Sequence, residues 1–240
     1  MPLQERVVVI TGAAGGLGQA VTRACLLAGA RVVAAHRGRL DRDALSPELG
    51  SAELGAEAPR LQLVEADLTD EAAAEALAEA ALQRQGRLDG WLNLVGGYAG
   101  GTPVAELTLA DFEAMFALNV RTAFLGSRAA LRAMLPRGRG SVVNVSSLGA
   151  LRGMAGHAGY AASKAAVIRL TETLAAEAAP RGVRVNVILP GLIDTPANRA
   201  AMPDADRSTW VAPETIAAVL VFLLSDAARG INGASLPVGG

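Results

Sequence analysis

Tyr160 and Lys164 are the residues whose types and spacing most directly suggest chemistry. They stand four positions apart in a segment with helical patterning, so their side chains share one face of a helix. Lys164 is the only lysine in a chain that otherwise uses arginine for its strong bases, and an ammonium is a compact charge where a guanidinium is a broad planar fork. A nearby cation lowers the pKa of a phenol. The pair therefore predicts a tyrosine that gives a proton to a carbonyl oxygen, rather than a solvated lysine beside a core tyrosine.

Polar residues at two other places fit the same chemistry. Ser146 and Ser147 follow a predicted strand and precede Tyr160 by 14 and 13 residues. A hydroxyl there can hold a substrate carbonyl oxygen, although a serine pair is also common in a turn. Asn119 interrupts the apolar helical segment MFALNVRTAF, and a buried amide without partners costs about 1–3 kcal/mol. Asn119 is therefore either a satisfied core amide or a residue that holds water in a proton relay.

A glycine-rich turn, TGAAGGLG, spans Thr11 to Gly18 and contains Gly12, Gly16 and Gly18. It follows an apolar, β-branched run and opens a helical pattern. Glycines in this context allow a tight turn, and the amides at the helix N-terminus then face a pyrophosphate. The motif predicts nucleotide binding rather than a purely structural turn. Asp67, at the end of the third predicted strand, is either an adenine contact or the N-cap of the next helix.

The end of the second predicted strand, AAHRG, bears on the choice of nucleotide. Enzymes that use NAD place an acidic residue there for the ribose 2′-hydroxyl, whereas an arginine suits a 2′-phosphate. His36 occupies the expected acidic position and Arg37 follows it. The sequence therefore predicts a preference for NADP(H), with NAD(H) as the second possibility, against the alternative that Arg37 is merely exposed.

Strands and helices alternate along the whole chain. Apolar runs, rather than alternating patterns, indicate a parallel sheet covered on both faces. We expect a doubly wound, three-layer α/β/α sheet in a single domain, residues 1–240, with ligands at the carboxyl ends of the strands. The predicted strands are 6–11, 31–35, 61–65, 88–95, 141–145, 183–189 and 235–238, the helices are 15–28, 69–85, 109–135, 158–179 and 213–224, and residues 38–59 form a loop with a helical turn.

Composition narrows the class of protein. The net charge of −1 shows no basic excess for nucleic acid. The apolar run Ile216–Leu224 is shorter than the roughly 20 residues of a membrane helix. Cys25 has no partner for a disulfide, and His36 and His157 are too few for a metal centre. We expect a soluble, cytoplasmic protein that binds no metal, nucleic acid or membrane.

Together these motifs resemble the short-chain dehydrogenase/reductase family over essentially the whole chain. The resemblance includes the glycine turn, the adenine-contact motif Ala66–Leu68, the segment PGLIDT and a catalytic tetrad, in which the spacing to tyrosine favours Ser147 over Ser146. It implies a Rossmann fold and the catalytic residues Asn119, Ser147, Tyr160 and Lys164. It implies cofactor contacts at Gly12, Gly16, Leu17, Gly18, Arg37, Asp67, Leu68, Asn93, Gly96, Tyr160, Lys164, Pro190, Gly191, Ile193 and Thr195.

The mechanism that the resemblance implies is hydride transfer between nicotinamide and a carbonyl or secondary alcohol of a small substrate. In that mechanism Tyr160 is the acid or base, Lys164 lowers its pKa and holds the nicotinamide ribose, Ser147 orients the reacting oxygen, and Asn119 holds a water. The resemblance also implies a homo-oligomer, a tetramer or dimer, formed through the helices at 109–135 and 158–179.

Departures from the family pattern leave alternatives open. The usual N-N-A-G reads Asn93, Leu94, Val95, Gly96, so the second asparagine is missing. The predicted substrate lid, about residues 192–212, is short and similar to that of dihydropteridine reductases, so a reductase of that type is one alternative. A non-catalytic NAD(P)-binding sensor or scaffold is another, and the complete tetrad argues against it.

Overall fold

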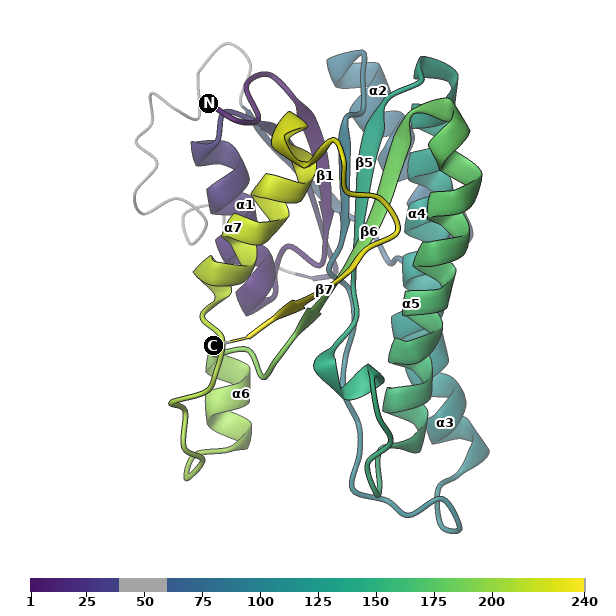
Figure 1. Cartoon of the computed structure of the whole chain (residues 1–240), viewed down its shortest axis with the longest axis vertical. Coiled ribbons are helices and arrows are strands. Elements are labelled where there is room, and N and C mark those ends of the chain that lie inside the picture. The colour runs from purple at the N-terminus through teal and green to yellow at the C-terminus, as the bar shows by residue number, and fades with distance from the viewer. Residues whose placement is uncertain (39–59, 240) are drawn as a thin grey trace.

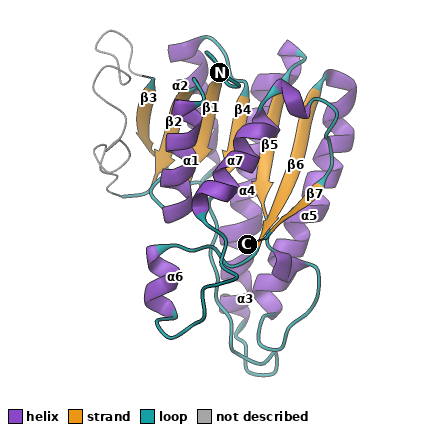
Figure 2. Cartoon of the chain, turned by 60° about the vertical axis from the view of Figure 1, so that its left-hand side comes forward, coloured by secondary structure: helices purple, strands orange, loops and turns teal. Residues whose placement is uncertain are grey.

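A parallel sheet forms the centre of the computed structural model, which describes residues 1–38 and 60–239 (Figure 1). The strand order in this part of the chain is β3-β2-β1-β4-β5-β6-β7, and every neighbouring pair is parallel. The carboxyl ends of the strands therefore share one edge of the sheet, toward which the arrowheads point in Figure 2. The strands are β1 Val7–Thr11, β2 Arg31–His36, β3 Leu61–Glu65, β4 Gly90–Asn93, β5 Gly140–Val145, β6 Val183–Pro190 and β7 Ser235–Val238.

Helices cover both faces of the sheet, because successive strand residues point to opposite sides. Val8 belongs to a core with residues of α1 (Gly16–Leu27) and α7 (Pro213–Leu224). Val9 belongs to a second core with residues of α2 (Glu71–Gln85), α4 (Thr122–Met134) and α5 (Ala158–Ala178). The predicted single-domain, three-layer Rossmann architecture is confirmed.

The order of the strands reverses between β1 and β4, which are paired neighbours in the sheet. The chain runs outward from β1 through β2 to β3 and then returns to pair β4 with β1, with Val9 opposite Trp91. Loops that leave the two strands diverge at such a point, which is where sheets of this type bind ligands. The glycine-rich turn leaves β1 at this position.

The predicted helix 109–135 is wrong in its centre, where it is not a continuous α-helix. It consists of α3 (Leu109–Phe116), a π-helical segment (Ala117–Arg121) and α4, which ends at Met134. A π-helical turn contains an extra residue, and such turns occur frequently at functional sites. Asn119 lies in the middle of this turn, and its side chain is buried.

The predicted strand 88–95 is too long at both ends. β4 covers only Gly90–Asn93. Beyond Asn93, the backbone N–H of Leu94 donates to the hydroxyl of Thr11 at 3.1 Å instead of continuing the ladder. The turn after β4 is consequently fixed to the end of β1.

Two other segments differ from the prediction. α2 begins at Glu71 instead of 69, because the carboxylate of Asp70 caps it by accepting from the N–H of Ala73 at 2.8 Å. A short helix that was not predicted, α6 (Pro196–Ala201), lies within residues 192–212. The remaining predicted elements agree to within one residue at each end, and the loop expected at 38–59 lies outside the described residues except for its first position. No helix among the described residues is long and apolar enough to cross a membrane.

Candidate active site

The predicted site residues gather at the carboxyl edge of the sheet. Gly12, Arg37, Gly96, Ser147 and Gly191 each follow a different strand of this edge. Tyr160 lies in the first turn of α5. The sheet topology therefore assembles residues that are up to 179 positions apart in the sequence, from Gly12 to Gly191.

Ser147 and Tyr160 come together beside Gly149. A Cβ atom on Gly149 would lie 3.5 Å from Ser147 Oγ and 3.6 Å from Tyr160 Cε1. Ser147 Oγ also accepts from the N–H of Gly149 at 3.1 Å, which fixes the serine at the start of a 3₁₀ turn. Burial raises the pKa of the Tyr160 phenol, and a hydrogen bond with the Ser147 hydroxyl partly opposes that rise. The two hydroxyl groups are thus placed to share one substrate oxygen.

The neighbouring Ser146 has a different role. Its hydroxyl is buried and donates to the backbone oxygen of Lys164 at 2.7 Å. This bond joins the end of β5 to α5. The side chain of Ser146 is therefore structural, and Ser147 is the serine that faces Tyr160.

Lys164 is buried, with only 6% of its surface exposed. Its Nζ donates to the backbone oxygen of Val145 at 3.1 Å. Burial disfavours the charged form and lowers the pKa of the ammonium to about 8. Since this value is still above 7, the positive charge persists at neutral pH.

The amide of Asn119 has all its polar atoms occupied. Its Oδ1 accepts from the N–H of Gly97 at 2.9 Å, and its Nδ2 donates to the oxygen of Gly97 at 3.2 Å and to Ser163 Oγ at 3.0 Å. Ser163 Oγ in turn donates to the backbone oxygen of Tyr160 at 2.8 Å. These bonds satisfy the amide, as the first predicted alternative requires, and the water-holding role stays a prediction. Asn119 positions the loop after β4 against the first turn of α5.

The glycine-rich turn has the shape of a pyrophosphate cradle. Gly12 adopts a left-handed φ of +70°, and a Cβ on Gly18 would overlap the backbone oxygen of Gly12, so both positions require glycine. The N-cap of α1, Gly15, offers no capping side chain, and the first turn carries no acidic residue. The first amides of α1 are therefore free for an anion. A Cβ on Gly16 would lie 3.0 Å from Cγ2 of Thr195, so the segment after β6 reaches over this turn.

Comparison with known proteins decides the family. A family model described as short chain dehydrogenase matches residues 6–206. The chain belongs to the short-chain dehydrogenase/reductase family. It is 35% identical to levodione reductase of Leifsonia aquatica, covering 98% of this chain and 93% of that protein. It is 36% identical to D-threitol dehydrogenase of Mycolicibacterium smegmatis, with 99% and 93% covered.

Solved structures agree with the family assignment. The crystal structure of levodione reductase superimposes with a TM-score of 0.86 at 33% identity and covers 99% of this chain and 97% of that one. The chain is accordingly an oxidoreductase that acts on CH–OH or C=O groups by NAD(P)-dependent hydride transfer. This confirms the reaction class that the sequence resemblance implied.

In this short-chain dehydrogenase/reductase, Arg37 and Asp67 lie beside each other at the ends of β2 and β3. Arg37 is 72% exposed at its side chain, and its Nη1 is 3.6 Å from Asp67 Oδ2. Asp67 Oδ1 accepts from the N–H and the hydroxyl of Thr69 at 3.0 and 2.8 Å. These hydrogen bonds, with the nearby guanidinium, hold the pKa of the Asp67 carboxyl below its usual value. Asp67 is not the N-cap of α2, because Asp70 has that position.

Asn93 lies inside the protein rather than on its open edge. It is 4% exposed, and its Oδ1 accepts from Trp91 Nε1 at 2.7 Å. Its Nδ2 donates to Asn144 Oδ1 at 2.7 Å and to Ser127 Oγ at 3.0 Å. The structure therefore places the Asn93 side chain in a buried polar network that ties β4 to β5 and α4.

The other predicted cofactor contacts are mainly backbone positions. Leu68 and Pro190 are buried, and Leu17 and Ile193 pack against the core. The N–H of Gly191 donates to the oxygen of Val238 at 2.9 Å. The Thr195 hydroxyl caps α6 by accepting from the N–H of Asn198 at 3.2 Å. These residues shape the loops over the carboxyl edge.

Sequence reasoning did not identify three residues next to the tetrad. Ser163 connects Asn119 with Tyr160, and its signal was its position three residues after the tyrosine on the same helix. Tyr98 lies against Tyr160, with ring centroids 5.0 Å apart and ring planes at 78°. The Nε2 atom of His157 lies 2.9 Å from the hydroxyl of Tyr98, and the two groups form a hydrogen bond. The chain has only two tyrosines and two histidines, and that scarcity was the available signal.

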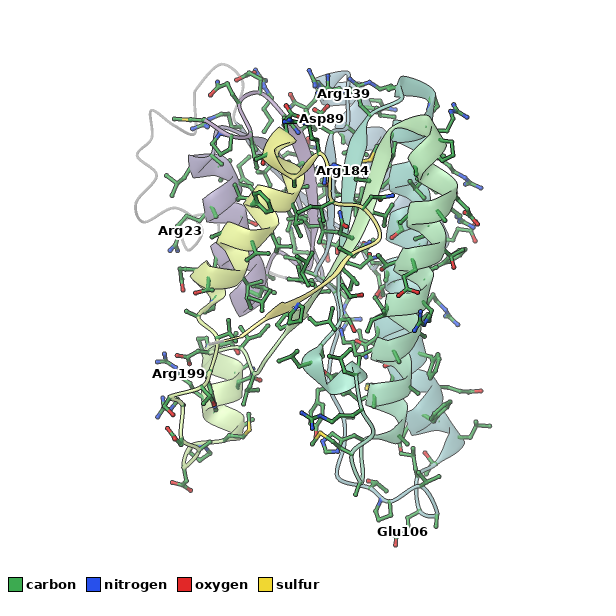
Figure 3. All side chains as sticks on the ribbon, viewed as in Figure 1. Arg23, Asp89, Glu106, Arg139, Arg184 and Arg199 are labelled. Atoms are coloured by element: carbon green, nitrogen blue, oxygen red, sulfur yellow. The ribbon has the colours of Figure 1, made fainter. Side chains whose placement is uncertain are left out.

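A second charged cluster lies at the opposite edge of the sheet. Figure 3 shows Asp89, Arg139 and Arg184 there, far from Arg199 of α6. Arg87 binds Asp89 with two hydrogen bonds of 2.6 and 2.7 Å. Burial alone would raise the pKa of Asp89, but these bonds hold it below its usual value. The cluster holds the amino ends of the strands together.

Among the described residues, no group of three His, Cys, Asp or Glu is arranged to hold a metal ion.

Proposed function

We propose that the chain exchanges hydride between NADP(H) and a small carbonyl or secondary-alcohol substrate, with Asn119, Ser147, Tyr160 and Lys164 at the centre of the site. The observation that carries this proposal is the pairing of these four side chains at two glycines, Gly149 and Gly96. Ser147 and Tyr160 both approach Gly149, while Asn119 Oδ1 and Lys164 Nζ both approach Gly96.

Tyr160 and Ser147 handle the reacting oxygen. During reduction the phenol of Tyr160 donates a hydrogen bond to the substrate carbonyl and then gives up its proton. During oxidation the phenolate removes the proton from the alcohol. The hydroxyl of Ser147 donates a second hydrogen bond and keeps the oxygen in place. The nicotinamide ring supplies or accepts the hydride when it is bound.

Lys164 has two tasks that one ammonium can perform together. Its charge, placed at a buried position of α5, favours the phenolate form of Tyr160. The backbone oxygen of Val145 takes one of its three N–H donors. The other two are free to hold the hydroxyls of the nicotinamide ribose.

The glycine-rich turn and the loops after the neighbouring strands supply the remaining cofactor contacts. The amides of Gly16, Leu17 and Gly18, with Gly12, hold the pyrophosphate at the start of α1. Asp67 and Leu68 lie at the adenine end, and Gly96 supports the ribose from the turn after β4. Asn93, the last residue of β4, can contribute to the ribose site only through its backbone, because its side chain is buried. Pro190, Gly191, Ile193 and Thr195 hold the nicotinamide end.

The preference for NADP(H) rests on Arg37. No carboxylate occurs at positions 36–38, and Arg37 projects from the end of β2 with a largely exposed guanidinium. A fork of this kind binds a 2′-phosphate strongly. We expect Arg37→Gln to raise the KM for NADPH about tenfold and to leave the KM for NADH nearly unchanged. Arg229→Gln, an exposed arginine beyond α7, is the matched control. Equal or better catalytic efficiency of the wild type with NADH would overturn the preference.

Residues 192–212 form the substrate lid of this proposal. Its two ends meet, since Ile193 and Val211 form an isolated parallel bridge. Asp194 and Arg199 fix α6 with hydrogen bonds of 2.5 and 2.7 Å. Leu192, at the base, is 41% exposed and offers an apolar surface. The lid is therefore an ordered loop with a pinned base and a short helix.

A purified-enzyme screen tests the function. The names of the relatives direct the choice of substrates, so the screen contains cyclic diketones, polyols and plain ketones with NADPH and NADH. Tyr160→Phe serves as the inactive control and should lose at least about a hundredfold in turnover. Quinonoid dihydropterin is included, because its preferential reduction would favour the dihydropteridine-type alternative. Nucleotide binding without any turnover would favour the sensor or scaffold.

The assembly proposed for the enzyme is a homo-oligomer, a tetramer in its complete form. A hollow of about 940 Å³ on the outer side of α3 and α4 is lined by Phe112, Phe116 and Phe124, and Phe124 is 41% exposed. Apolar surface of this kind favours symmetric pairing with a second copy. Phe124→Asp should weaken the assembly in light scattering at micromolar concentration. A stable wild-type monomer of 24.4 kDa would overturn the proposed assembly.

The single cysteine is consistent with the predicted cytoplasmic location.

A further inference from the structure

Tyr98 is a polar residue beside Tyr160 that the proposed reaction does not use. Its side chain is 60% exposed, and the edge-to-face contact with Tyr160 holds its ring. Tyr98 lies on the turn after β4. The residue before it, Gly97, forms two hydrogen bonds with the amide of Asn119. The ring is thus fixed on one side while the hydroxyl end remains accessible.

Hydrogen bonds define the direction of the Tyr98 hydroxyl. His157 Nδ1 is 2.8 Å from the backbone oxygen of Ala155, which can only accept, so Nδ1 carries the proton. In the neutral imidazole Nε2 is then the acceptor, and Tyr98 donates to it at 2.9 Å. The hydroxyl proton is occupied in this way, and the lone pairs of Tyr98 Oη are left to accept.

The loop that carries Tyr98 is joined to the segment that carries His157. The N–H of Gly101 donates to the oxygen of Gly156 at 2.8 Å. A Cβ on Gly156 would lie 3.1 Å from Gly101 Cα, and Gly156 has a φ of +77°, so this close approach requires glycine. The Tyr98–His157 pair is therefore a preorganised pair rather than two freely moving surface side chains.

The segment that leads to Tyr160 adds exposed apolar side chains. The segment between Ser147 and Tyr160 exposes Leu151 at 59% and Met154 at 56%. The chain thus presents exposed apolar side chains on the segment that leads to Tyr160, and an acceptor, Tyr98 Oη, on the ring that contacts Tyr160. This combination selects a molecule with an apolar body and a second polar group that donates.

We propose that Tyr98, oriented by His157, accepts a hydrogen bond from a hydroxyl group of the substrate while the reacting carbonyl lies on Tyr160 and Ser147. The substrate class is then a hydroxyketone with an apolar body, or in the reverse direction the corresponding diol. A plain ketone has no second group, and a diketone has a second oxygen that cannot donate. This inference rests on the proposed function, since it specifies the substrate of the same site.

Three matched substrates test the inference: a cyclic ketone, its hydroxyketone and its diketone. We expect the wild type to favour the hydroxyketone in kcat/KM by about tenfold over the other two. Tyr98→Phe keeps the ring against Tyr160 and removes only the oxygen, so the preference should disappear while plain-ketone turnover is retained. His157→Leu, which removes the partner that orients the hydroxyl, should reduce the preference as well.

The outcomes separate this inference from the proposed function. Turnover of the plain ketone with no preference for the hydroxyketone, or an unchanged preference in Tyr98→Phe, overturns the inference and leaves the function in place. An unchanged preference in His157→Leu overturns the orienting role of the imidazole. A wild type that reduces none of the three overturns the proposed function, and the inference with it.

Discussion

Asn119 and Lys164 reach the same point from different helices, and that point is Gly96. A Cβ atom on Gly96 would lie 2.9 Å from Asn119 Oδ1 and 3.0 Å from Lys164 Nζ. The missing side chain of Gly96 therefore makes the space in which the amide and the ammonium come together. Gly96 does not have a positive φ angle, so its backbone conformation alone does not demand glycine. Glycine is required here because a Cβ atom would meet the two side chains.

Gly96→Ala tests that relationship. The added methyl group must displace the Asn119 amide, which loses its hydrogen bonds to Gly97, or move the ammonium of Lys164. We expect kcat to fall at least about tenfold and the free energy of unfolding to fall by about 1 kcal/mol. Gly230→Ala is the control, because nothing lies within 4 Å of its Cβ position. Wild-type kinetics in Gly96→Ala would show that the two side chains tolerate separation.

The two adjacent serines should separate catalysis from stability. Ser147→Ala removes a hydrogen-bond donor to the reacting oxygen, so we expect kcat to fall about a hundredfold with little change in thermal unfolding. Ser146→Ala removes the buried bond to the oxygen of Lys164, so we expect about 1–2 kcal/mol less stability and turnover within about fivefold of wild type. Steady-state kinetics and denaturant unfolding of both variants decide the assignment. The reverse pattern would mean that Ser146 holds the substrate.

Local pattern was enough to predict that the strands exist and the edge at which they end, although the bounds of β4 were wrong. Apolar runs such as residues 7–10 are buried throughout, so their extent is visible in composition alone. Tyr160 and Lys164 were likewise accessible, because a helix places residues four apart on one face. These features depend on neighbours in the sequence, and for them the sequence was sufficient.

Features that depend on distant partners were not predicted. The π-helical turn at Asn119 accommodates an amide that bonds Gly97, 22 residues earlier. Asn93 ends a strand, and only the fold shows that Trp91, Ser127 and Asn144 take up its amide. The Tyr98–His157 contact joins residues 59 positions apart. No periodicity in a window of 10 to 20 residues carries such information.

Burial of Lys164 has a consequence for stability against pH. Its pKa falls from 10.5 to about 8 in the folded state, so between these values the unfolded chain binds more protons and stability rises with pH. Relative to Lys164→Met, the wild type should gain about 2 kcal/mol between pH 7 and pH 10. Above pH 10 the raised pKa of Tyr160 acts in the opposite direction, so the comparison stops there. Denaturant unfolding at fixed protein concentration measures the free energy of unfolding of both proteins at each pH. If this free energy changed with pH in the same way in both proteins, the lowered pKa of Lys164 would be contradicted.

Lys164→Arg is the most revealing conservative change, because it keeps the charge and nearly the same helix propensity. The ammonium occupies a buried position bounded by Val145 O and Gly96, and a planar guanidinium cannot occupy the same point. We expect the variant to fold and to lose at least about tenfold in turnover with NADPH, about 1.4 kcal/mol in barrier. A displaced cation stabilises the phenolate of Tyr160 less, so its pKa rises and the pH–rate profile shifts to higher pH. Arg169→Lys, on the exposed side of α5, is the control and should leave both readouts unchanged. Wild-type turnover with an unshifted profile in folded Lys164→Arg would remove Lys164 from the mechanism, and the assignment of Tyr160 would then need a different cation.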